Sequence, residues 1–115
     1  MGEIDQGKVE HVVKQDGLPD LVFDGRLLAE VKSPRLRLNG EVVLKLFETS
    51  GEQYVCQRVT HDRLDGSKYT AKDLPNEAEL VRHLADRQGA LGHLEKALLR
   101  KAGLGNLPAV SEKVN

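Results

Sequence analysis

The segment His61-Asp62-Arg63-Leu64-Asp65 contains the residue types from which general acid–base catalysis is built. A histidine titrates near neutral pH and can move a proton, and carboxylates can orient it. Such groups act together only where the fold brings them into one pocket. Because the segment follows a β-prone run, we expect an exposed polar loop, and an enzyme that uses this loop remains an alternative hypothesis.

The remaining reactive side chains lack partners at useful spacing. His83 and Asp86 are three residues apart, which predicts a contact on a helix surface rather than half of a metal site. Cys56 is expected beside Lys45 and Arg58, cations that would lower the pKa of an exposed thiol. No base is placed beside it, so we interpret it as a small apolar filler. The sequence therefore predicts no catalytic residue, no metal site and no cofactor, and it contains no phosphate-loop or dinucleotide signature.

Basic residues suggest a second alternative, a nucleic-acid contact made by a strip of Arg35, Arg37, Lys45 and Arg58. Aromatic side chains on the same sheet could add a stacking surface, as in sheet-based single-strand binders. The overall charge opposes this function, because 17 basic and 18 acidic residues leave a net charge of −1.

The elements that must position these residues centre on a hairpin. Glu41–Glu48 and Gln53–Thr60 read as two strands, and we expect a four-residue loop over 49–52. That loop would place Glu48 opposite Gln53, which fixes every other pair of the hairpin.

This register sorts the side chains onto two faces. Two C-terminal helices are expected to cover the face with Val42, Leu44, Leu46, Val55 and Val59. The second face would leave apolar residues partly exposed among charges, and such a patch marks an interaction site. The predicted partner-binding residues are Val43, Lys45, Phe47, Tyr54, Cys56 and Arg58.

The rest of the chain predicts a meander followed by helices. Strands are expected over 8–14, 26–32 and 67–71, with a turn or bulge at Asp24-Gly25 and a loop or edge segment over Pro34–Leu38. Asn76 and Glu79 form a capping signal, and Gly103 is suited to a left-handed C-cap. The predicted fold is α+β: an antiparallel meander of four to five strands, then two helices on one sheet face.

Bulk properties indicate one domain. A chain of 115 residues can bury a single core, which we place at 1–104 with a loose tail over 105–115. One cysteine cannot form an internal disulfide, and no apolar run approaches a membrane span. We therefore expect a cytoplasmic protein.

Three segments, Phe23–Glu30, Leu46–Val55 and Asn76–Leu84, resemble a loose group of small bacterial proteins. Their shared pattern is roughly F-x-G-x-L-L-A-E, a strand that ends in an aromatic residue and Thr, a Gly turn, Y-V, and one or two late helices. The resemblance spans about residues 21–104. It implies a fold pattern and a bacterial setting, often a plasmid or other mobile element, and it implies no activity.

The leading functional hypothesis is a non-enzymatic binding or regulatory module. It would use the second sheet face for contact with a second copy of the chain or another protein. The sequence identifies no ligand and no pathway.

Overall fold

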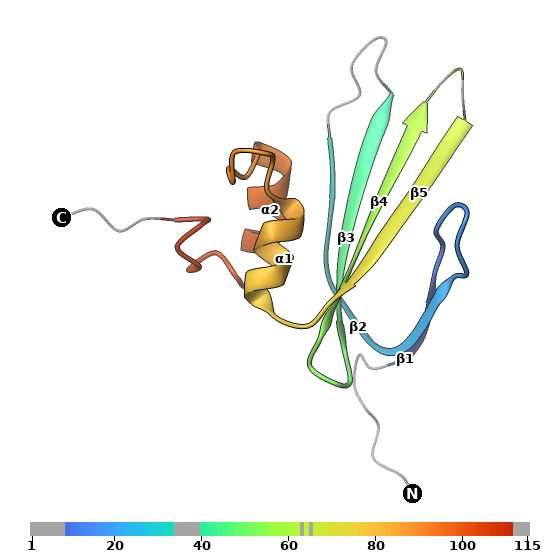
Figure 1. The fold of residues 1–115 in the computed structure, drawn as a ribbon, viewed down its shortest axis with the longest axis horizontal. Helices are drawn as coiled ribbons and strands as arrows, with labels where there is room; N and C mark the ends of the chain where they lie inside the picture. Colours follow the sequence, from blue (N-terminus) through green and yellow to red (C-terminus); the bar gives the residue numbers. More distant parts are fainter. Residues whose placement is uncertain (1–8, 34–39, 63, 65, 112–115) are drawn as a thin grey trace, which may run out of the picture.

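The chain folds as a five-stranded antiparallel meander followed by two helices (Figure 1). The computed structural model describes residues 9–33, 40–62, 64 and 66–111. Neighbouring strands in the sequence are neighbours in the sheet, so the predicted α+β meander is confirmed. The elements are β1 Val9–Val13, β2 Leu21–Lys32, β3 Glu41–Thr49, β4 Tyr54–Asp62, β5 Gly66–Leu74, α1 Glu77–Leu84 and α2 His93–Lys101.

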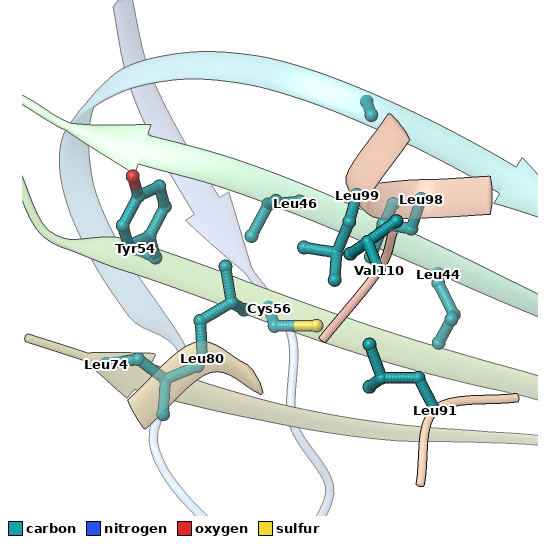
Figure 2. Close-up of a cluster of buried hydrophobic side chains, with 11 residues drawn as sticks. Leu44, Leu46, Tyr54, Cys56, Leu74, Leu80, Leu91, Leu98, Leu99 and Val110 are labelled. Atoms are coloured by element: carbon teal, nitrogen blue, oxygen red, sulfur yellow. The ribbon is translucent and has the colours of Figure 1, made fainter. Parts of the chain in front are cut away.

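Both helices pack on one face of the sheet. α2 lies against β2 and β3, while α1 lies against β4 and β5. Leu80, Leu98 and Leu99 of these helices are fully buried, and they meet Leu44 and Leu46 of β3 (Figure 2). Leucine dominates this core because the chain has four Phe and Tyr residues in total and no Trp. No helix in the described part of the chain has the length and apolar character that crossing a membrane would require.

The helix ends are those that the sequence predicts. The Asn76 side chain accepts a hydrogen bond from the backbone N–H of Glu79 at 2.9 Å, which satisfies one free donor of the first turn of α1. After α2, Gly103 has a φ of 84°. The N–H groups of Gly103 and Leu104 then bond back to the carbonyls of Arg100 and Leu99, the pattern of a Schellman motif.

The residues after α2 continue the core. Val110 is 5% exposed, and Leu104 and Leu107 pack against the same cluster. The sequence predicts a loose tail over 105–115, but the structure shows a packed segment up to residue 110. Leu107 and Val110 hold this segment against the core. Residues 112–115 lie outside the described part of the chain.

β2 is one long strand, where the sequence predicts a turn or bulge at Asp24-Gly25 and a strand after it. At Gly25 the backbone of β2 passes so close to β3 that a Cβ atom would overlap the carbonyl oxygen of Glu48. A bulge between Leu27 and Ala29 then shifts the register. The alternation of Leu27, Ala29 and Val31 in the sequence predicts that they share one face. The shift puts Leu27 and Ala29 on opposite faces, so this prediction is wrong.

The β1–β2 hairpin folds over the second face of the sheet, opposite the helices (Figure 1). The turn after β1 reaches the far edge strand: the N–H of Asp16 donates to the carbonyl of Tyr69, and the N–H of Tyr69 donates to the Asp16 carboxylate, both at 2.8 Å. The Gln57 side chain also donates to the carbonyl of Lys14 at 2.9 Å. The sheet is therefore curled, with its first strand brought towards its last.

Candidate functional site

The register of the β3–β4 hairpin differs from the predicted one by a single residue. Glu48 lies opposite Tyr54, not Gln53. The cause is the turn, which has three residues, because the N–H of Thr49 bonds to the carbonyl of Gln53 at 2.8 Å. Glu52 closes this turn with a φ of 62°, a left-handed conformation that is uncommon for glutamate.

A slip of one residue moves side chains to the other face of a sheet. Phe47 now pairs with Val55 and Leu46 with Cys56, so Tyr54, Cys56 and Arg58 lie on the helix side. Val43, Lys45 and Phe47 lie on the second face, together with Val55 and Val59. The six predicted partner-binding residues are thus divided between two faces. The expected assignment of Val55 and Val59 to the helix side is also wrong.

The apolar members of that predicted set are buried by the chain itself. Val43, Phe47, Tyr54 and Cys56 are between 2% and 8% exposed. The expectation that they form a partly exposed patch is therefore wrong. The helices cover two of them, and the β1–β2 hairpin covers Phe47.

Cys56, on the helix side of the sheet, is not a reactive nucleophile. Burial raises the pKa of this thiol to about 12, and the nearby Arg58 lowers it only in part. Figure 2 shows Cys56 within the same cluster as Leu46, Leu80 and Leu98. The predicted role of an apolar filler is confirmed. Burial, and then Glu77 and Glu48, raise the pKa of Tyr54 as well, so its hydroxyl stays protonated.

The second face is filled at one end. Val13, Phe47 and Val55 form a small buried cluster. The ring of His11 lies 5.6 Å from that of Phe23 and 4.9 Å from that of Phe47, measured between centroids. Its Nε2 is buried and has no hydrogen-bond partner among the described residues.

The other end of the second face stays open as a hollow. Its lining comes from all five strands and the residue after β1, and it includes Val12, Val43, Lys45, Gln57 and Val59. Lys45 lies on its wall with Nζ 3.9 Å from a carboxylate oxygen of Glu30. Of the predicted partner residues, only Val43 and Lys45 line this opening.

The segment His61–Asp65 does not assemble a catalytic group in the described residues. His61 Nδ1 is 2.7 Å from the Ser67 hydroxyl, and the Asp62 carboxylate accepts the N–H of Leu64 at 2.7 Å. Arg63 and Asp65 lie outside the described residues. His61 and Asp62 still belong to β4 and are half-buried, so the expected exposed loop is observed only at Leu64, which is 94% exposed.

No metal-binding cluster forms among residues 9–33, 40–62, 64 and 66–111, where no three His, Cys, Asp or Glu side chains converge. Asp86 follows α1, and it accepts hydrogen bonds from the N–H groups of Gln88 and Ala90. These bonds hold the pKa of its carboxyl below the ordinary value. Burial, aided by Lys72 and Arg58, lowers the pKa of His83. The two side chains thus have separate surroundings.

The predicted basic strip is not one surface. Arg35 and Arg37 lie outside the described residues. Arg58 is on the helix side, where it forms an ion pair with Glu95 at 2.9 Å, whereas Lys45 is on the second face. Arg58 and Lys45 therefore lie on opposite faces of the sheet.

Exposed apolar side chains gather on the β1–β2 hairpin instead. Among the described residues, six large hydrophobic side chains are exposed, and all but Leu64 lie in β1, the turn after it or β2: Val9, Val12, Leu18, Val22 and Leu27. Val12 and Val22 are directly opposite each other across the two strands, and they are 62% and 59% exposed. Sequence reasoning missed the exposed Val12–Val22 pair. The available signal was the short run of β-branched residues at the start of the sheet.

Comparisons with family models, curated proteins and solved structures find no significant match to this chain.

Proposed function

We propose that this chain is a non-enzymatic binding module, and that it acts by pairing with a second copy through the outer side of the β1–β2 hairpin. The observation that carries the proposal is the exposed Val12–Val22 pair near the turn end of that hairpin. The sequence predicts a partner contact through the second sheet face. Because the β1–β2 hairpin covers the apolar residues of that face, the proposed contact lies on the outer side of the hairpin instead.

The energetic argument rests on burial. Full removal of a valine side chain from water contributes roughly 1.5–3 kcal/mol. A two-fold contact uses the same patch on both copies, so it buries the pair twice without a second kind of surface.

Charge placement favours an antiparallel contact of two hairpins. Glu10 lies opposite Asp24, and both side chains are exposed. These carboxylates lie on one side of the valine pair, and the exposed Asp16 and Asp20 lie in the turn on its other side. Two copies that pack with opposite hairpin directions keep their two Glu10–Asp24 pairs apart, which limits like-charge repulsion between them.

The setting forms part of the same proposal. A single free cysteine that is buried is in keeping with a reducing cytoplasm. The resemblance of the three segments to small bacterial proteins supports a bacterial setting, often a plasmid or other mobile element.

Sedimentation equilibrium of the purified chain tests the proposal. We expect a monomer–dimer equilibrium, and we expect Val22→Lys to raise its dissociation constant by at least about tenfold, because two charged side chains would enter the contact. The Val22 side chain is exposed, so the variant should keep its circular dichroism spectrum.

Leu64→Lys is the matched control. It places the same charge at an exposed apolar position away from the hairpin, and it should leave the dissociation constant unchanged. A chain that stays monomeric up to about 1 mM, or a control that weakens the dimer as much as Val22→Lys, would remove the proposal.

A further inference from the structure

The open end of the second sheet face forms a hollow whose lining includes Val12 of the proposed dimer contact, and whose charged rim that contact does not explain. Its volume is about 390 Å³, within the range of small-molecule sites. Its floor contains Val43 and Val59, which are directly opposite each other and each 5% exposed. The rim is charged and is built from several strands: Lys14, Glu30, Lys32, Glu41, Lys45 and His61.

Three lysines from distant parts of the chain converge on this rim. Lys14 follows β1, Lys32 ends β2 and Lys45 is in β3. Lys14 holds its Nζ 4.8 Å from the centroid of the Tyr69 ring, a cation–π distance that orients the ammonium group. Within the described residues, Lys14 and Lys32 make no ion pair with a carboxylate, so they are available to an anion.

The fold holds this end of the hollow in place. The Gln57 side chain, which is 6% exposed, donates to the carbonyl of Lys14, and the Asp16–Tyr69 bonds tie the next residues to β5. The position of Lys14 over the sheet is therefore set by the same contacts that curl the hairpin inward.

Two carboxylates limit the charge of a ligand. Glu30 and Glu41 stand on the same rim, and Glu30 is 3.9 Å from Lys45. They repel a polyanion or a doubly charged phosphate, while two lysines without carboxylate partners still attract a single negative charge.

We infer that the hollow binds a small molecule with one carboxylate and a short apolar chain. The carboxylate contacts Lys14 and Lys32, and the apolar chain lies against Val43 and Val59. The apolar floor favours such a chain over an inorganic anion.

Titration of the ¹⁵N-labelled full-length chain with hexanoate, followed by NMR, tests this inference. We expect saturable shifts at the amides of Val43, Val59 and Tyr69. Acetate carries the same charge without the apolar chain, and it should bind at least about tenfold more weakly, because each buried CH₂ contributes ~0.8 kcal/mol. Equal binding of the two acids, or tighter binding of inorganic phosphate, would contradict the proposed ligand class.

Two variants locate the site. Lys32→Gln should weaken hexanoate binding about five- to tenfold, as expected for the loss of one charge-assisted contact. Lys72→Gln removes the same charge from an exposed position on the helix side of β5, and it should bind hexanoate like the unchanged chain. Shifts outside the hollow, no saturation up to about 50 mM, or equal losses in both variants would overturn the inference.

Discussion

Burial decides which titratable side chains of this protein can react. Cys56 lies beneath both helices, and desolvation outweighs the effect of Arg58 on its thiol. His11 is held by two phenylalanine rings, and the hydrogen-bonding capacity of its Nε2 is unused within the described residues. On the rim of the hollow, in contrast, Lys14 and Lys32 are available to a ligand.

The thiol of Cys56 should be protected in the folded protein. We expect Ellman's reagent at pH 8 to react at least about 100-fold more slowly with the native chain than with the urea-unfolded chain, because a buried thiol with a pKa of about 12 forms little thiolate. The chain has one cysteine, so the whole signal belongs to this residue. Similar rates in both states would show that the helices do not cover it.

At the scale of the elements, β2 departs most from a regular strand, because it approaches β3 closely at Gly25 and contains a bulge. Its first half pairs with β1 on one edge, and its second half pairs with β3 on the other. The strand bends where Gly25 approaches Glu48, and the bulge after Leu27 redirects the side chains. The hairpin can cover the second face only because this strand changes direction.

Gly25→Ala should therefore destabilise the protein strongly. The added methyl group would overlap the carbonyl of Glu48, a backbone atom that cannot move without disturbing β3. We expect a loss of about 2–4 kcal/mol in the free energy of unfolding, measured by urea denaturation.

Gly51→Ala is the control for this change. At Gly51 the nearest atom to an added methyl group is the Thr49 hydroxyl oxygen, at 3.8 Å. This substitution should alter stability by less than about 1 kcal/mol. Equal effects of the two substitutions would mean that the close approach at Gly25 does not constrain β2.

At the scale of the molecule, the described residues form two apolar clusters on opposite sides of one sheet. The larger lies between sheet and helices, and the smaller lies under the β1–β2 hairpin. The hairpin covers the smaller cluster and reaches β5 through Asp16 and Tyr69. The same arrangement exposes Val12 and Val22 outward and leaves the lysine-rimmed hollow open.

Loss of the Asp16 carboxylate should loosen the hairpin without unfolding the sheet. Asp16→Ala removes the acceptor for the Tyr69 N–H, a charge-assisted bond that contributes roughly 1.5–3 kcal/mol. Hydrogen exchange should become faster at the β1 amides, while the β3 and β4 amides keep their protection. Asp20→Ala, in the same turn, serves as the control, and faster exchange in that variant would exclude a specific role for Asp16.

Local chemistry made part of this fold predictable. The Asn76 cap, the Gly103 C-cap and the run of strands before helices all depend on residues close together in the chain, so their signals survive without tertiary context. The unreactive role of Cys56 also followed from the lack of a neighbouring base.

The surfaces were decided by tertiary structure. Sequence alone determined that this chain forms a meander with two helices, because periodicity and capping are local. It did not determine the faces, since the left-handed Glu52 shortens the turn by one residue and that slip exchanges the sides of β4 relative to β3. Nor did it determine what covers the second face. That depends on bonds between Asp16 and Tyr69, 53 residues apart, and only the folded chain brings them together.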